Sequence, residues 1–370
     1  MAPDPRLLLR QTQPCRPLPT THAAKTALSS LLRSRFRRRR SQASHLHYYR
    51  GDFGLGVGSC AGLSWRGLSC CSCRILFCIK KVFRLYKTDE AKRKVAGRCA
   101  ESLHKTIQEI KLEHGDAQLK AFQVDLSSLQ SIMKFETSFK QWLLDSDLHP
   151  SVQLLINNAG ILATSARLTV DGYDQMIQTN YISAVVLTCL LLPLIKNSPS
   201  PSRIVNVTSF THRCASNLKL DRKKFSLMEI SKKYPFASIY EYSKLCLLLF
   251  SYELHRQLHA ENPSSKVSVI PVDPGVVQTN ILREVPLCLS QLAFRVLSFL
   301  QVLQSPEVGV SSIIDAALAP SNVSGEYFFG GKGRRMSSSS LSYNAKVSAE
   351  LWLNTSIIQE QINLLRSPIS

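Results

Sequence analysis

Tyr240 and Lys244 lie four residues apart in the motif YEYSK. A phenol has an unperturbed pKa of about 10, so a tyrosine can exchange protons near neutral pH only where a cation stabilises its phenolate. Residues four apart on a helix share one face, which would place the Lys244 ammonium beside Tyr240. The spacing therefore predicts a tyrosine that acts as a general acid and base.

Other polar residues follow apolar, strand-like runs. Ser209 follows RIVNV, the motif NNAG at 157–160 follows VQLLI, and Pro274 with Gly275 follows VSVIPV. A serine hydroxyl at a strand end could hydrogen-bond the charge that develops on a substrate oxygen. Taken singly, each residue is more often a packing, turn or solvated residue. Their order along the chain and their position at strand ends favour a shared site.

Strand-like runs alternate with helical periodicity from residue 95 onward. We expect strands at 119–124, 152–156, 203–207, 267–272 and 326–329, and helices at 102–114, 127–144, 171–196 and 242–258. This alternation predicts an α/β fold with a Rossmann-like, doubly wound parallel sheet. The apolar run VVLTCLLLPLI within 171–196 is too short to span a membrane and predicts a buried core helix.

In this order the motifs resemble the short-chain dehydrogenase/reductase family over about residues 95–355. The stretches VDLSS, LLINNAG, RIVNVTSFTH, YEYSKL and VDPGVVQTNI are most similar to its retinol-dehydrogenase-like and X-linked dehydrogenase/reductase-like branch, particularly the plant members. The resemblance implies an NAD(P)-dependent oxidoreductase that interconverts an alcohol and a carbonyl.

The resemblance also assigns catalytic roles to residues of this chain. Tyr240 would be the acid and base, and Lys244 would lower its pKa and reach the nicotinamide ribose. Ser209 would polarise the substrate oxygen, and Asn180, in the helix after NNAG, would hold a water that relays the proton to solvent.

Cofactor contacts follow from the same resemblance. Asp125 would contact the adenine, the NNAG segment would lie along the adenosine ribose, and Thr279 would contact the nicotinamide carboxamide. Arg98 would meet a 2′-phosphate, which suits guanidinium geometry and favours NADP over NAD. The expected contacts are Arg98, Asp125, Asn158, Ala159, Gly160, Tyr240, Lys244, Pro274, Gly275 and Thr279.

The family's phosphate-binding motif, TGxxxGxG after the first strand, is absent before Arg98. The glycines of GDFGLGVGS, at 51–59, have the wrong spacing and follow no strand. Because the first strand lies in the middle of the family's sheet, its loss would separate the strands near Arg98 and Asp125 from the others. Residues 74–79 (RILFCI) could fill the gap. The alternative function is therefore an inactive family member, or an alternative gene product that lacks this loop.

The formal charge of +20 is concentrated in the first quarter of the 370 residues. Residues 1–94 carry 20 basic and 4 acidic side chains, whereas residues 95–370 carry 26 and 22. The nearly neutral second part argues against a nucleic-acid-binding core. We expect a basic extension over 1–94, disordered or transit-like, and a catalytic domain over 95–370.

The extension leaves several interpretations open. Residues 1–50 are rich in arginine with one acid, Asp4, which fits a plastid or mitochondrial transit peptide, a nuclear signal or an unselected disordered segment. A membrane-associated or cytoplasmic location is the alternative. Arg66 and Arg74 interrupt the apolar stretch 59–79, so we do not expect it to span a membrane. The 11 cysteines lack zinc-site spacing, and we expect free thiols and no metal.

Two segments bear on the substrate. The stretch between Ser209 and Tyr240 contains a cationic insertion over 214–236, and residues 285–303 are strongly apolar where the family's substrate lid lies. Together they favour a hydrophobic alcohol or carbonyl, such as a retinoid, sterol or isoprenoid, delivered from a membrane surface. An ordinary packed lid helix is the alternative.

Overall fold

The computed structural model describes residues 93–98, 100–113, 115, 119–145, 149–215, 234–277, 280–282, 284–299, 303–330 and 333–366. Residues 1–92, Thr279 and most of the cationic insertion (216–233) lie outside the described residues. The expectations for the basic extension, for a strand at 74–79 and for Thr279 therefore stay predictions.

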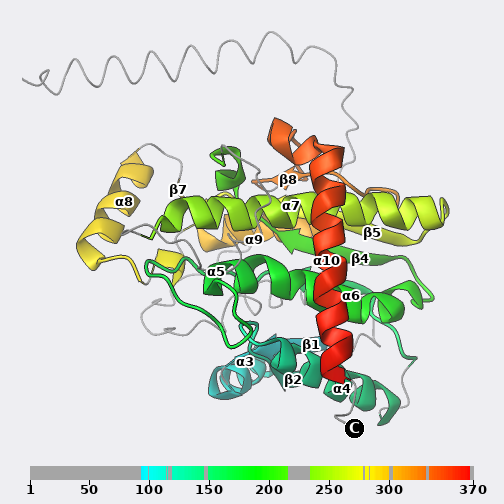
Figure 1. The fold of residues 1–370 in the computed structure, drawn as a ribbon. Coiled ribbons are helices and arrows are strands. Elements are labelled where there is room, and N and C mark those ends of the chain that lie inside the picture. The colour runs from blue at the N-terminus through cyan, green and yellow to red at the C-terminus, as the bar shows by residue number, and fades with distance from the viewer. Residues whose placement is uncertain are drawn as a thin grey trace, which may run out of the picture. The chain divides into compact units, whose positions relative to one another are not determined.

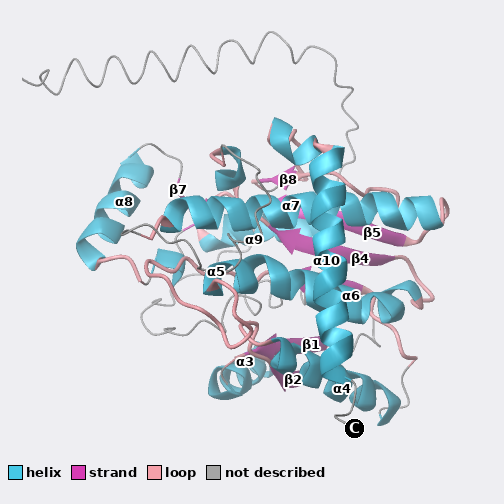
Figure 2. Ribbon diagram, in the orientation of Figure 1, coloured by secondary structure: helices cyan, strands magenta, loops and turns pink. Residues whose placement is uncertain are grey.

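The larger sheet has four parallel strands (Figures 1 and 2). Its strands follow the order β3 (Leu154–Asn157), β4 (Ser202–Val207), β5 (Val267–Asp273) and β8 (Phe328–Phe329). Every residue of β4 and β5 is buried, as is usual for parallel strands covered on both faces. In β3, by contrast, the first three residues are only half-buried.

A separate two-stranded parallel sheet contains β1 (Arg93–Gly97) and β2 (Leu119–Gln123). Among the described strands, β1 pairs with β2 alone and β3 pairs with β4 alone. The α/β class with parallel strands is confirmed. The division between β1 and β3 falls where the sequence predicts that a first strand is missing. A third short pair joins β6 (Val276–Val277) to β7 (Leu303–Gln304).

Helices cover the strands, with bounds close to those expected. The helical elements are α3 (Ala100–Glu113), α4 (Leu129–Asp145), α5 (Gln175–Ile177), η1 (Gln178–Ile182), α6 (Ser183–Lys196), η2 (Phe210–Arg213), α7 (Phe236–Glu261), η4 (Asn280–Leu282), α8 (Leu287–Phe299), α9 (Pro306–Ala317), η5 (Ser340–Tyr343) and α10 (Ala345–Arg366). The helix expected from residue 171 begins at Gln175, because the Asp174 carboxylate caps it by accepting the Met176 and Ile177 N–H groups. The helix expected from residue 242 begins at Phe236 and so includes Tyr240.

Side-chain packing joins the two sheets. One apolar core contains Phe122 of β2, Phe135 and Phe139 of α4, and residues of α6, α7 and α10. The Phe122 ring lies 5.6 Å from each of those two rings, edge to face. Across the division, the Asp171 carboxylate accepts the N–H of Leu129 at 2.8 Å and so caps the first turn of α4.

The continuous helix Gln175–Lys196 is long and apolar enough to cross a membrane by length and composition. Of its apolar window, 67% is buried inside the protein. It is thus the core helix that the sequence predicts, and its apolar character reflects contacts with α4, α7 and the sheet.

Candidate active site

Helix α7 places Lys244 next to Tyr240. The Lys244 Nζ lies 5.9 Å from the centroid of the Tyr240 ring, and the two residues are 3% and 9% exposed. Nζ also donates a hydrogen bond to the Val207 carbonyl at 2.9 Å, at the end of β4. A buried ammonium needs such polar partners to offset its lost hydration. The pair predicted from spacing is therefore brought together, with the cation fixed against the strand end.

The NNAG loop meets this pair through Asn180. Asn180 lies in the π-helical turn η1, a feature found frequently at functional sites. Its Oδ1 accepts the Ile161 N–H at 2.8 Å, and its Nδ2 donates to the Ile161 carbonyl at 3.0 Å and to Ser243 Oγ at 3.1 Å. These bonds show Asn180 holding the loop after Gly160, while its relay of protons through water stays a prediction.

A side chain at Gly160 would press against Lys244. A Cβ at this position would lie 3.2 Å from Lys244 Nζ and 3.5 Å from Asn180 Oδ1. The last residue of NNAG, Asn180 and Lys244 therefore occupy one small volume. Asn157, the first residue of the motif, is buried and donates from Nδ2 to Thr188 Oγ1 at 2.9 Å and Asn206 Oδ1 at 2.8 Å. It ties β3 to α6 and β4, a structural role that the sequence did not indicate.

Ser209 follows β4 and caps η2. Its Oγ accepts hydrogen bonds from Thr211 N and Thr211 Oγ1, at 3.4 and 3.1 Å. Because both bonds use lone pairs, the hydroxyl proton can be donated to a substrate oxygen. His212 Nδ1 lies 2.6 Å from the Ser209 carbonyl and fixes its main chain.

A buried carboxylate, Asp273, lies behind Lys244 and was missed in the sequence. It is 0% exposed at the end of β5, and its oxygens accept the Gly275 N–H and the Tyr327 O–H, each at 2.8 Å. Burial raises the pKa of the carboxyl group, opposed by these two hydrogen bonds and by the charges of Lys244 and Arg213. The available signal was an acidic residue ending an otherwise apolar buried strand, directly before PG.

Pro274 and Gly275 form a tight turn beside Asp273. Gly275 has a φ of +80°, which a side chain would strain, and an added Cβ would lie 2.8 Å from Gln304 Oε1. That oxygen is buried and has no hydrogen-bond partner among the described residues. An unpartnered buried acceptor beside the turn is suited to an N–H group of a ligand.

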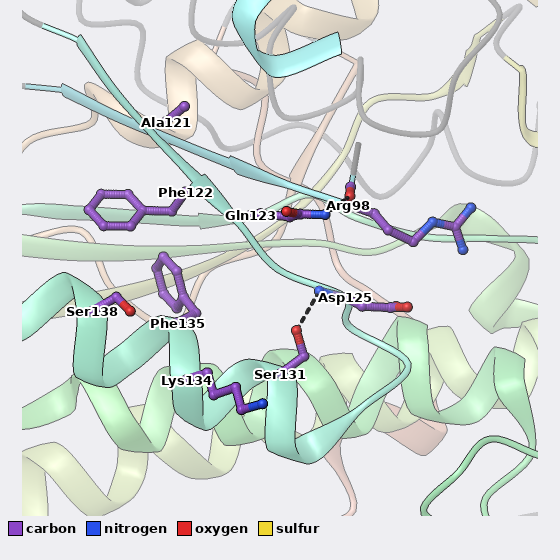
Figure 3. A pocket seen from close by; sticks show the side chains of 9 residues that line it. All are labelled: Arg98, Ala121, Phe122, Gln123, Asp125, Ser131, Lys134, Phe135 and Ser138. Carbon is purple, nitrogen blue, oxygen red and sulfur yellow. Dashed lines mark hydrogen bonds between the residues drawn. The ribbon is translucent and has the colours of Figure 1, made fainter. Parts of the chain in front are cut away.

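Arg98 and Asp125 lie at the carboxyl ends of β1 and β2. Figure 3 shows both side chains projecting toward the same side of a cavity of about 490 Å³, which Lys134 of α4 also lines. Asp125 Oδ1 accepts hydrogen bonds from the N–H and hydroxyl of Ser127, at 2.9 and 2.7 Å. Its carboxylate therefore also shapes the turn into α4. The exposed Arg98 side chain is placed to meet an anion.

The surroundings of Tyr240 are apolar. Its side chain clusters with Ala163, Met176 and Tyr234, and the partly buried side chains around them are Ile161, Leu162, Phe236, Ile239 and Ile281. Burial raises the pKa of Tyr234, whose hydroxyl donates to Asp174 at 2.7 Å. The segment before α8 is tied to the loop after β3 by the Arg167–Glu284 ion pair, at 2.6 Å.

Among the described residues, no group of three His, Cys, Asp or Glu side chains is placed to hold a metal ion. The expected absence of a metal site stays a prediction. The four described cysteines, Cys189, Cys214, Cys246 and Cys288, form no disulfide.

Comparison with known proteins points to one family. The sequence profile described as short chain dehydrogenase matches residues 80–217. The chain is 34% identical to a polyprenol dehydrogenase of Homo sapiens over 263 residues, which cover 70% of this chain and 74% of that protein. It is 34% identical to retinol dehydrogenase 14 of Mus musculus over 216 residues, 58% of this chain and 59% of that one. The fold is similar to the NADPH-bound carbonyl reductase from chicken fatty liver, with a TM-score of 0.50, 17% identity and coverage of 71% and 95%.

Proposed function

The chain belongs to the short-chain dehydrogenase family, and on that premise we propose that it is an NADP-dependent oxidoreductase that interconverts an alcohol and a carbonyl on a hydrophobic substrate. The observation that carries this proposal is the Lys244 ammonium, buried beside Tyr240 and tied to the end of β4. The relatives named above are dehydrogenases of polyprenol and retinol, and both names support a long, apolar alcohol.

The acid–base step follows from these positions. The Lys244 charge stabilises the Tyr240 phenolate, so the phenol can give up its proton to a carbonyl oxygen or the phenolate can take one from an alcohol. Ser209 donates a hydrogen bond to the same oxygen, without giving up its proton, and stabilises the charge that develops there. A bound nicotinamide would accept or supply the hydride. Asn180 keeps the loop at Ile161 in place while the proton moves.

Several described residues fit an NADP cofactor. Gln304 Oε1, buried and unpartnered beside Gly275, fits the N–H of a nicotinamide carboxamide. Arg98 at the mouth of the cavity fits a 2′-phosphate, and Asp125 lies beside it for the adenine. In the proposal, Asn158 and Ala159 continue the cofactor groove from Gly160, and Thr279 contacts the carboxamide from outside the described residues.

The same proposal extends to a membrane surface. Leu292, Val296 and Phe299 recur at i, i+4 and i+7 on α8 and are 58%, 48% and 76% exposed. The helix contains Arg295 and no acidic residue. An apolar stripe with a cationic neighbour suits the interface of a bilayer. Because Ile281, just before α8, packs near Tyr240, an apolar substrate could pass from the lipid to the site.

Titration of the purified full chain with NADPH, followed by fluorescence and by thermal shift, tests the cofactor proposal. Saturable binding in the micromolar range is expected, with weaker binding of NADH. A folded chain that responds to neither nucleotide would instead establish the inactive alternative, in which the missing glycine motif has abolished binding.

Flotation with neutral phosphatidylcholine vesicles in high salt tests the membrane contact, because salt screens the basic residues 1–94. Replacing Leu292, Val296 and Phe299 together by glutamine should release the protein. The matched control replaces three exposed leucines on other helices, Leu112, Leu144 and Leu353, by glutamine. Equal release by both variants would contradict a contact through α8.

Location in the cell is a further part of the proposal. The arginine-rich residues 1–50 would direct the chain to a plastid or mitochondrion. Imaging a fluorescent fusion of the full chain beside one that lacks residues 1–50 tests this. An unchanged distribution would exclude a targeting role for the segment.

A further inference from the structure

Asp273 is a buried carboxylate at the point where β4, β5 and α7 meet. Asp273 is fully buried. Its two carboxylate oxygens accept hydrogen bonds from the Gly275 N–H and the Tyr327 O–H, each at 2.8 Å. The Gly275 bond closes the turn that follows β5. A carboxylate removed from water is retained only where such donors and a nearby cation offset the lost hydration.

The cationic groups that face Asp273 come from α7 and η2. Lys244 of α7 donates to the carbonyl of Val207, which pairs in register with Val272, the residue before Asp273. Arg213 of η2 donates to the Ser337 carbonyl at 2.5 Å, and its guanidinium lies 5.8 Å from the centroid of the Tyr327 ring. Both charges favour the ionised carboxylate.

His212, which packs against Tyr327, is held neutral. Its Nε2 accepts the Ser339 N–H at 3.1 Å, so the proton is on Nδ1, which donates to the Ser209 carbonyl at 2.6 Å. Its ring lies against Tyr327, with centroids 5.4 Å apart, and carries no charge to Asp273. Tyr327 is 2% exposed and acts as a neutral donor, since burial raises the pKa of its phenol. Lys244 and Arg213 are thus the cations acting on Asp273.

We propose that Asp273 is a positioning residue for the hydride transfer proposed above: its carboxylate fixes the Pro274–Gly275 turn and supplies the buried negative charge opposite the Lys244 ammonium. The assignment rests on the proposed function, in which this turn borders the nicotinamide. Asp273 acts through Lys244 and Gly275, and it touches neither substrate nor reacting atoms.

The charge has a defined effect on Tyr240. The Lys244 ammonium favours the phenolate, and the Asp273 carboxylate reduces that positive field. Removing the negative charge alone should therefore lower the pKa of Tyr240. Alcohol oxidation requires the phenolate, so the rate of oxidation falls as the pH drops below the pKa of Tyr240. This fall is the acid limb of the pH–rate profile, and it should move to lower pH when the Asp273 charge is removed.

Asp273→Asn removes the charge while keeping an oxygen for the Gly275 N–H. We expect the acid limb of kcat/KM for alcohol oxidation to move down by about half a pH unit or more, with NADPH affinity within threefold of the parent chain. The matched control is Glu253→Gln. Glu253 is also a buried carboxylate, but it lies on α7 and pairs with Arg256. That variant should leave the limb in place. An unmoved limb in Asp273→Asn overturns the positioning role.

A double-mutant cycle tests the same pair without turnover. Lys244→Met leaves the Asp273 carboxylate without its α7 cation and should lower the Tm, whereas adding Asp273→Asn should restore part of the loss. Additive Tm changes overturn the assignment, whether or not the chain is active. Failure of the unaltered chain to bind NADPH overturns the proposed function separately, because the cycle needs neither cofactor nor substrate.

Discussion

The four-stranded sheet and the two-stranded sheet hold their candidate residues in opposite ways. Around β4 and β5, Asn180 and Lys244 are buried and fixed by hydrogen bonds to main-chain groups. Around β1 and β2, the Arg98 side chain is exposed, and Asp125 bonds to Ser127 within its own turn. The proposed acid–base group is therefore set by long-range buried contacts, and the proposed nucleotide group by local ones.

The two regions also differ in what aligns them. A strand ladder fixes register through directional hydrogen bonds, but no such ladder joins β1 to β3 among the described strands. Apolar packing of α4 against α6 and α10, with the Asp171 cap, supplies the connection instead. Apolar contact is non-directional, so the distance between the catalytic and nucleotide residues depends on how well this core is filled.

Loss of the Tyr240 hydroxyl should give the largest change, confined to the catalytic region. We expect Tyr240→Phe to reduce kcat by about 10²- to 10⁴-fold, the usual contribution of a general acid, with little change in NADPH affinity or Tm. Steady-state kinetics measures kcat, NADPH titration measures the affinity, and thermal shift measures the Tm. Tyr242→Phe, which removes a hydroxyl two residues along α7, serves as the control, and a similar loss of kcat there would refute the distinction.

The aromatic core of the nucleotide region can be weakened through Phe122. Phe122→Ala leaves a cavity among Phe135, Phe139 and Trp142 and should lower the free energy of unfolding by about 3–5 kcal/mol. Hydrogen exchange should accelerate more in β2 and α4 than in β4 and β5. Leu144→Ala, at an exposed position on α4, should change stability by less than about 0.5 kcal/mol. Uniform acceleration across both sheets would show that they unfold as one unit.

Acid should act on the catalytic region through His212. Burial lowers the pKa of His212 from 6.5 to about 4, so between these values the unfolded chain binds the proton that the folded chain does not. The free energy of unfolding should then fall as pH drops from about 6.5 to about 4, by about 3 kcal/mol from this residue. Urea unfolding at a series of pH values measures the slope. It should become shallower in His212→Gln, and an unchanged slope would remove His212 as the cause.

Arg98→Ala should have the smallest effect, limited to the nucleotide. Loss of a charge-assisted contact to a 2′-phosphate should weaken NADPH binding by about tenfold and leave NADH binding unchanged. Lys140→Ala, which removes an exposed cation from α4, away from β1, is the control. Parallel weakening of both nucleotides would contradict a 2′-phosphate contact at Arg98.

The sequence predicted the parts of this fold that depend on local pattern. The α/β alternation, the division of the sheet and the buried core helix follow from apolar periodicity and from a missing motif. Helix α7 begins at Phe236, six residues before the expected start, because its continuous apolar run begins only at Leu245 and the first two turns carry a weaker apolar signal. The sequence pattern predicts a helix from residue 171, but the helix begins at Gln175 because the Asp174 side chain caps it.

The polar network behind the site could not be found by pattern. Asp273 and Tyr327 are 54 residues apart, and only the pairing of β5 with β8 brings them together. The side-chain bonds of Asn180 to Ile161 likewise depend on a loop that returns across the helix. Sequence motifs named the reactive residues, whereas the tertiary fold determines which groups surround their charges.

The π-helical turn at Asn180 changes the angular phase of the helix Gln175–Lys196. A turn of this kind contains an extra residue, so side chains after it are rotated relative to those of an unbroken α-helix. Within the π-helical turn, Asn180 faces the loop at Ile161 and Ser243 of α7. After it, Thr188 faces Asn157 at the end of β3. A single residue of extra length thus lets one helix direct polar side chains toward both the loop at Ile161 and the end of β3.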